Sequence, residues 1–334
     1  MIKQGQVRVY CCGGASINIV YPLIEVGHGA SDPGYADIEY TVLDTSRSNL
    51  LGKDIPEDIF FHVENREKDI TDGSGKVKTT NLAAARQAVP EILNMYPPVD
   101  LNIVVSSASG GSGSVINSLL VTELLSRGKN VVVISIGSST SAKEIGNTLT
   151  TLESYQAIAE KRDRPVVCYY LDNSKSTLGH NDNMARTIIL LLAAIWSGEN
   201  LGLDRKDLEN LLNYQNVTEY QPGLVGLDIC GQGETITVPK GMAVSTVVTM
   251  IASNEEDHNP GIPVGYHSYG VFSDRSISRL NVGTPIHLYT VQGYFTPIVK
   301  ELHQAQKAAK ESYAVNPVDK IKISGNADDD GLVV

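Results

Sequence analysis

The chain has 334 residues, 42% hydrophobic and 19% charged, so it can form two domains that share an interface and is too apolar to be disordered. The formal net charge is −11, and no long cluster of lysine and arginine occurs. Because a nucleic-acid backbone requires a basic patch, we expect no direct nucleic-acid binding. Small anions remain possible ligands, since backbone N–H groups bind phosphate without any lysine.

The cysteines and the apolar runs bear on compartment and membrane association. Cys11, Cys12, Cys168 and Cys230 form no CxxC pair and have no histidine spacing typical of zinc. Burial of the adjacent Cys11 and Cys12 as small hydrophobic residues, in a reducing cytoplasm, is the favoured interpretation. The first residues lack the apolar core of a signal peptide, and the run 188–196 is too short to span a bilayer. We therefore expect no membrane partner.

Strands and helices alternate along the first half of the chain, which predicts an α/β fold with a parallel sheet covered by helices. The predicted strands are 7–12, 38–43, 101–106, 130–136 and 165–171. The predicted helices are 80–95, a segment that follows the loop 107–114 and ends at 126, 143–161 and 181–196. The last of these is apolar on nearly every face, so it must be covered all round and we expect it between two domains.

The second half of the chain has a different pattern. A short amphipathic helix is predicted at 204–212, and β-rich runs follow at 244–251, 264–272 and 285–291, separated by Gly, Pro and Asn turns. This pattern predicts a smaller second α+β domain built on its own sheet. A helix over 296–313 and an acidic tail complete the chain.

Three glycine-rich loops, at 13–18, 72–76 and 109–114, follow the predicted strands. In an open α/β sheet, ligands bind outside the carboxyl ends of the strands, where these loops would gather. Glycine lets the backbone approach a phosphate closely, and a helix N-terminus favours an anion. One such loop is equally well explained as a turn, but three at one edge of the sheet indicate a phosphate site.

Other nucleotide and catalytic motifs fit less well. No segment matches the Walker A pattern GxxxxGK[ST], and the first loop does not match GxGxxG. The stretch 110–114 nearly matches the nucleophile elbow G-x-S-x-G, with Ser112 as nucleophile and Ser114 in place of the last glycine. The histidines available as its base are His258, His267, His287 and His303. None has a supporting signature, so a serine hydrolase is a minor alternative.

The third loop, Ser107-Ala-Ser-Gly-Gly-Ser-Gly-Ser-Val115, resembles the tubulin/FtsZ signature GGGTGSG, with Ser109 in place of the first glycine and Ser112 in place of threonine. Further segments resemble that family in the same order. They are Gly13-Gly14 with Asn18 (first phosphate loop), Gly73-Ser-Gly75 (terminal phosphate), Glu144-Ile-Gly-Asn147 (ribose), Leu171-Asp-Asn173 (guanine) and His180-Asn-Asp182 (guanine, at the start of the long helix).

The resemblance implies that the chain binds GTP and GDP together with Mg²⁺. The implied nucleotide-binding residues are Gly13, Gly14, Ser16, Asn18, Gly73, Ser74, Gly75, Ser109, Gly110, Gly111, Ser112, Gly113, Ser114, Glu144, Asn173, Asn181 and Asp182. Asn173 and Asn181 also fit the roles of a turn former and a helix cap. An amide offers both a donor and an acceptor, whereas a carboxylate suits the N1–H and N2–H₂ donors of guanine, so the choice between Asn181 and Asp182 stays open.

Within this superfamily, the phage tubulin (PhuZ) family is the most similar, and the resemblance covers nearly the whole chain except 27–70. That family has a GSGSV loop, an LDxxD segment after the central helix and a tail that ends in DGMVV. The corresponding segments here are Gly111–Val115, Leu203–Asp207 and Asp328–Val334. The implied divisions are 1–180 (GTPase domain), 181–200 (central helix), 201–295 (catalytic loop and second domain), 296–315 (C-terminal helix) and 316–334 (acidic tail).

Asp204 and Asp207 lie three residues apart, so both carboxylates face one side of a helix start. The resemblance implies that they orient water at the nucleotide of the next copy in a head-to-tail homopolymer. The alternative is that Asp204 is an N-cap and Asp207 supplies helix-dipole charge. A related bacterial sequence has Asn where this chain has Gly202, which leaves a non-hydrolysing polymer scaffold as a second alternative.

The acidic tail is the other candidate contact surface. On composition alone it is a solvated segment. The resemblance implies instead that Asp328, Asp329 and Asp330 dock on basic residues of a neighbouring copy. It further implies filaments that position phage DNA, capsids or a nucleus-like cargo in the cytoplasm of an infected bacterium.

Overall fold

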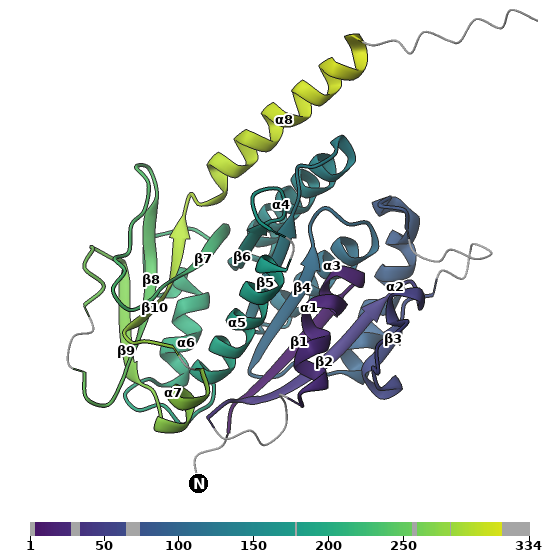
Figure 1. The fold of residues 1–334 in the computed structure, drawn as a ribbon. Helices are drawn as coiled ribbons and strands as arrows, with labels where there is room; N and C mark the ends of the chain where they lie inside the picture. The colour runs from purple at the N-terminus through teal and green to yellow at the C-terminus, as the bar shows by residue number, and fades with distance from the viewer. Residues whose placement is uncertain are drawn as a thin grey trace, which may run out of the picture.

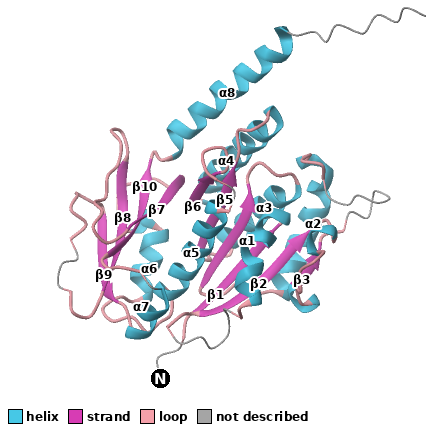
Figure 2. Cartoon of the chain, viewed as in Figure 1, coloured by secondary structure: helices cyan, strands magenta, loops and turns pink. Residues whose placement is uncertain are grey.

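The computed structural model describes residues 4–27, 34–64, 74–177, 179–255, 259–280 and 282–315. One ten-stranded sheet runs through these residues in the order β3-β2-β1-β4-β5-β6-β7-β10-β8-β9. Helices cover both of its faces (Figures 1 and 2). The predicted α/β fold is confirmed. Of the described helices, none is long and apolar enough to cross a membrane.

The first half of the chain forms the parallel part of the sheet. Its strands are β1 (Gln6–Cys12), β2 (Asp37–Asp44), β3 (Phe60–His62), β4 (Leu101–Ser107), β5 (Val131–Gly137) and β6 (Val166–Asp172). Its helices are α1 (Gly14–Glu25), α2 (Leu82–Met95), α3 (Ser112–Ser126), α4 (Ala142–Arg162) and α5 (His180–Ile195). Every predicted strand and helix of this half is present. The short edge strand β3, which has no alternating pattern of its own, was not predicted.

The second half contributes the remaining strands and three more helices. They are α6 (Arg205–Leu212), β7 (Leu224–Cys230), β8 (Ala243–Ile251), β9 (Tyr266–Val271), α7 (Asp274–Leu280), β10 (Ile286–Gln292) and α8 (Phe295–Val315). Helix α8 packs on α4 through Phe295 and Leu302 near its start and then projects beyond the rest of the molecule (Figure 1).

The parallel strands are buried on both faces, which is why their sequences are continuous apolar runs. Successive side chains of β1 point to opposite faces. Val9 and Cys11 pack in the core that contains α1 and α5, whereas Tyr10 and Cys12 pack in the core that contains α2, α3 and α4. Both cysteines are free thiols and are buried, as predicted. Burial raises the pKa of the Cys11 thiol, so it is an inert core residue.

Helix α5 is the predicted central helix. It packs against α1 and α7, and Figure 1 shows it between the parallel strands and the strands of the second half. Its side chains share one core with Val9 of β1 and Val248 of β8. Residues 188–196 are buried apart from the partly buried Leu190, whereas His180, Asn183 and Thr187 are exposed, so the predicted cover all round holds only for the apolar part of the helix.

The prediction of a separate second sheet is wrong. Strand β7 pairs in parallel with β6 along 166–168 and antiparallel with β10, so one sheet continues through both halves. The sequence pattern does not predict a strand at 224–230. Without that strand, the parallel strands of the first half and the strands of the second half are not paired with each other. Pairing through β7 satisfies backbone groups that two separate sheet edges would leave exposed. The proposed domain boundaries stay a prediction.

The packing of Tyr294 on β7, where β7 pairs with β6, can be tested by a substitution. A Cβ atom placed on Gly226 would lie 2.4 Å from Cγ of Tyr294, whose ring covers the strand where β6 and β7 pair. We expect Gly226→Ala to lower the free energy of unfolding by about 1–3 kcal/mol, measured by urea denaturation. The control is Gly146→Ala in α4, where the nearest atom would be 3.6 Å away and helix propensity favours alanine. Equal stability of the two variants would contradict the role of Tyr294.

Candidate functional site

The first and third glycine-rich loops touch at the carboxyl ends of β1 and β4. A Cβ atom on Gly113 would lie 2.4 Å from the carbonyl oxygen of Cys12, so only glycine fits there. Gly13 has φ +83° and also contacts Gly113. This close approach places the N-termini of α1 and α3 side by side, where their unpaired N–H groups and helix dipoles favour an anion.

The second loop lies over the start of α3. The N–H of Ser112 donates to Oγ of Ser74 at 3.1 Å, and a Cβ atom on Gly111 would lie 2.0 Å from that oxygen. Gly75 adopts φ +55°, a left-handed conformation that glycine readily supplies. Gly73 lies outside the described residues. The described part of all three predicted loops therefore meets at one place.

Ser112 contacts polar side chains that are not among the predicted nucleotide-binding residues. Its Oγ accepts from Oγ1 of Thr45 at 2.8 Å and from Nδ2 of Asn81 at 3.1 Å. His267 and His287 instead bond Thr249 in β8, and His303 is exposed on α8. His258 lies outside the described residues. The described contacts of Ser112 thus supply no histidine base for a serine hydrolase.

The serine hydroxyls of the loops mostly serve the loops themselves. Oγ of Ser16 donates to the carbonyl of Gly13 at 2.7 Å, and Oγ of Ser114 donates to the carbonyls of residues 110 and 111. Ser109 and Ser107 share a hydrogen bond of 2.9 Å. Asn18 is exposed on α1. Backbone N–H groups of the loops are therefore the groups best placed to bind phosphate.

Asp44, at the carboxyl end of β2, is an acidic residue that the sequence analysis did not assign to the site. It accepts from the N–H groups of Thr45 and Ser46 and, at 2.7 Å, from Nδ2 of Asn49, which lies against Gly14. Burial raises the pKa of this carboxyl, and the hydrogen bonds oppose that shift. An acid at the end of a parallel strand beside β1 was the signal that could have identified it.

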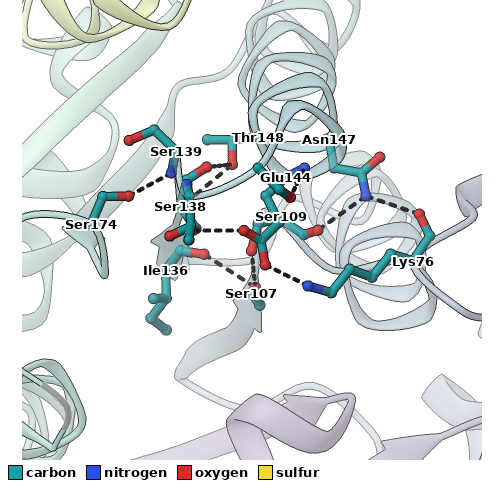
Figure 3. A network of polar contacts seen from close by, with 12 residues as sticks. Lys76, Ser107, Ser109, Ile136, Ser138, Ser139, Glu144, Asn147, Thr148 and Ser174 are labelled. Carbon is teal, nitrogen blue, oxygen red and sulfur yellow. Dashed lines mark hydrogen bonds and ion pairs between the residues drawn. The ribbon is translucent and has the colours of Figure 1, made fainter. Parts of the chain in front are cut away.

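A polar network joins the second loop to α4 and the end of β5 (Figure 3). The carboxylate of Glu144 forms an ion pair with Nζ of Lys76 and accepts from Oγ of Ser138 at 3.2 Å. The hydrogen bond from Lys76 is the main reason that the pKa of Glu144 is lowered. Nδ2 of Asn147 donates to the carbonyls of both Lys76 and Ser109 at 3.0 Å. Asn147 therefore holds the second and third loops together.

The predicted base-binding residues also meet. Nδ2 of Asn181, which is buried at the start of α5, donates to Oδ1 of Asn173 at 2.7 Å. Asn173 follows β6 and is exposed. Asp182 is half-buried in the first turn of α5. Of the two alternatives for the second base contact, Asn181 is the residue coupled to Asn173.

Asp204 and Asp207 lie away from these loops. Asp204 is the N-cap of α6, and the two residues form a reciprocal capping box, so the capping interpretation is correct for Asp204. Asp207 also accepts from the hydroxyl of Tyr266 at 2.6 Å. Helix α5 separates them from the loops with its 16 residues, a length of about 24 Å. Asp328, Asp329 and Asp330 lie outside the described residues.

The order of parallel strands, the three glycine-rich loops at their carboxyl ends and the central helix that connects to a second set of strands are the arrangement that the resemblance to the tubulin/FtsZ fold predicts. No protein-family model matches the chain. The phage tubulin-like protein of Pseudomonas phage PhiPA3 is 27% identical over 338 residues, which cover all of both chains.

Two of the solved structures that share this fold come from phage tubulins. A TubZ protofilament from bacteriophage PhiKZ has a TM-score of 0.79 at 22% identity, covering 98% of this chain and 99% of that one. The phage tubulin PhuZ with GDP has a TM-score of 0.77 at 21% identity, with the same coverage. The chain thus has the tubulin/FtsZ fold, and its predicted resemblance to the phage tubulins is confirmed.

Lys78 ties the segment before α2 to α4 beside this site. Its Nζ donates to the carbonyl of Asn147 at 2.7 Å and to Oγ1 of Thr151 at 2.5 Å. Burial lowers the pKa of Lys78 to about 8. The folded protein therefore releases this proton at a lower pH than the unfolded chain does.

The difference between the folded and unfolded pKa of Lys78 predicts that stability depends on pH, and a variant without this lysine isolates that contribution. Between the folded pKa and the higher unfolded pKa, the unfolded chain binds more protons, so the contribution of Lys78 to stability rises with pH. From about pH 7.5 to about pH 9, we expect wild type to gain about 1 kcal/mol relative to Lys78→Met. Urea denaturation of both proteins at each pH gives the difference in their free energies of unfolding. The cysteines and tyrosines that both proteins share titrate equally in each, so their contribution cancels in this difference. A constant difference across that range would contradict the lowered pKa.

Proposed function

We propose that this protein is a GTPase that assembles head to tail into filaments and hydrolyses GTP at the contact between copies. The observation that carries this proposal is the separation of its two predicted sites by α5. The glycine-rich loops lie at the carboxyl ends of the parallel strands. Helix α6 lies by the amino ends of β4 and β5, because Arg205 at its start pairs with Asp100 and Asn213 after its end bonds Asn130. Asp204 and Asp207 cannot reach the loops of their own copy, but a second copy stacked end to end can supply them.

The arrangement of the loops supports guanine nucleotide as the ligand. The paired N-termini of α1 and α3 would bind the phosphates, and Glu144 would bind a ribose hydroxyl. The Asn173–Asn181 pair would contact the base, because an amide can pair with both donors and acceptors of guanine. One structural neighbour, the phage tubulin PhuZ, was solved with GDP, which is a ligand of this class.

The residues of the phosphate end also fit a magnesium ion. Mg²⁺ keeps most of its ligands as phosphate oxygens and water and needs only one or two protein groups. Asp44 is the carboxylate beside the first loop, and Thr45 and Ser112 bring hydroxyl groups to the start of α3. We propose that these residues hold the ion, which would neutralise charge on the phosphates during transfer.

Asp204 and Asp207 would orient the attacking water for the nucleotide of the adjacent copy. Asp204 is exposed, and the capping box together with Tyr266 fixes the direction of Asp207. Capping and catalysis are compatible here, since a carboxylate has more acceptor positions than the cap uses. Phosphoryl transfer requires mainly such positioning.

Gly202 departs from the Asn of a related bacterial sequence, and its conformation accounts for the exchange. Its φ is +75°, and a Cβ atom there would lie 3.7 Å from the nearest atom, so space does not exclude a side chain. Asn is the residue that, after glycine, best tolerates this left-handed conformation. The left-handed conformation is one that glycine and asparagine both adopt, and we propose that hydrolysis proceeds without a side chain at this position.

The tail and the cellular role rest on the resemblance to phage tubulins. We propose that Asp328–Asp330 dock on basic residues of a neighbouring copy, which implies that added salt weakens assembly. We further propose a filament in the host cytoplasm that positions phage DNA or capsids. A protofilament is the form in which one structural neighbour, TubZ of bacteriophage PhiKZ, was solved.

Assembly is the first test of the proposal. Light scattering and pelleting after addition of Mg²⁺ with GTP, GDP or ATP should show polymer with GTP alone, above a critical protein concentration. Phosphate release should rise only once polymer forms, because the site is completed between copies. A folded protein that forms no polymer with any nucleotide would remove the filament from the proposal.

Asp207→Asn separates hydrolysis from assembly. Asparagine keeps an acceptor oxygen for the cap but removes the charge, so we expect polymer with GTP and at least about a hundredfold slower phosphate release. Glu209→Gln, on the same short helix, is the control for loss of a negative charge. Equal phosphate release from wild type and Asp207→Asn would defeat the catalytic assignment. If wild-type polymer releases no phosphate, the alternative of a non-hydrolysing scaffold is favoured. If a serine-reactive probe labels Ser112, the alternative of a serine hydrolase is favoured.

A further inference from the structure

The nucleotide site has little positive charge to set against phosphate. The chain carries a net charge of −11, and across the three glycine-rich loops the sequence contains one cation, Lys76. Backbone N–H groups supply partial charges only, so a full ammonium charge at this position is electrostatically significant. The contacts of Lys76 are therefore of particular interest.

Lys76 directs its charge to Glu144 rather than to the phosphate end of the site. Its ammonium group pairs with the Glu144 carboxylate across the second and third loops (Figure 3). The Lys76 side chain is 53% exposed and that of Glu144 only 15% exposed. The lysine is the partner that can move, since its long stem has several rotatable bonds and remains in solvent.

The side chain of Ser74, in the same segment, occupies a second position that a phosphate would take. Oγ of Ser74 accepts from the N–H of Ser112 in the first turn of α3. A phosphate bound at that helix N-terminus needs this donor. Gly75 and Lys76 both adopt left-handed conformations, with φ of +55° and +62°, which are costly for a lysine. Ser74 and Lys76 flank one glycine, so a movement of this short segment would change both contacts.

We propose that Lys76 is the cationic phosphate ligand of this site and reaches it by exchange. When a nucleotide binds, a phosphate oxygen takes the Ser112 N–H from Ser74, and the Lys76 ammonium leaves Glu144 for the phosphates. Glu144 is then released to accept a hydrogen bond from a ribose hydroxyl. The exchange makes the site selective for phosphorylated nucleotides over nucleosides. It rests on the proposed function, because it assumes that the loops hold a nucleotide.

The test compares ligands that differ only in phosphate. Wild type and Lys76→Met are titrated with guanosine, GDP and a non-hydrolysable GTP analogue. In Lys76→Met we expect the ratio of GTP-analogue affinity to guanosine affinity to fall roughly tenfold or more, since a charge-assisted hydrogen bond is lost. Guanosine should bind as well as to wild type or better, because its ribose no longer competes with an ammonium group. Lys76→Arg should restore most of the ratio.

Lys143→Met is the matched control. Lys143 is exposed, is adjacent to Glu144 and carries the same charge, so its loss should leave the ratio unchanged. An equal loss of affinity for guanosine and the GTP analogue in Lys76→Met would show a merely structural role and overturn the inference. An unchanged ratio would overturn it as well. Absence of guanine-nucleotide binding by wild type would instead defeat the proposed function itself.

Discussion

The close contact between the end of β1 and the start of α3 is the constraint on which the site depends. The carbonyl of Cys12 lies so near Gly113 that no side chain fits between them. Because β1 and β4 are parallel neighbours, that contact brings two helix N-termini together at one edge of the sheet. The second loop then packs on Gly111, and Asn147 ties it to the third loop. Small residues in the loops are thus a packing requirement that also leaves backbone N–H groups open to an anion.

Helix α5 determines how far the two parts of the proposed reaction lie apart. Its apolar surface is buried against both halves of the sheet, so packing fixes its position between them. Asn181 at its start belongs to the base end of the site, and the chain beyond its end leads to Asp204 and Asp207. Under the proposed function, a single copy carries both halves of the catalytic site but cannot bring them together, whereas stacking of copies would.

The polar groups around the loops show why a strongly acidic protein can be proposed to bind an anionic ligand. Glu144 is neutralised by Lys76, and the charge of Asp44 is offset by backbone and amide donors. Among the described residues, the loops offer backbone N–H groups, and the half-exposed ammonium of Lys76 lies beside them. Local donor geometry, rather than net charge, governs binding at such a site.

Much of this architecture could be predicted from the sequence, because it depends on local patterns. The strands of the parallel half, the buried central helix and the three loops follow from apolar periodicity and from glycine after strands, and Asp204 was recognisable as a cap. The sequence could not show that β7 joins the two halves into one sheet, since strand pairing is a long-range contact. It also gave no sign that Asp44 and Asn81 surround the loops, that Asn147 bonds two of them, or that Lys76 pairs with Glu144. These residues are far apart in the chain, and only the packing of helices on the sheet brings their side chains together.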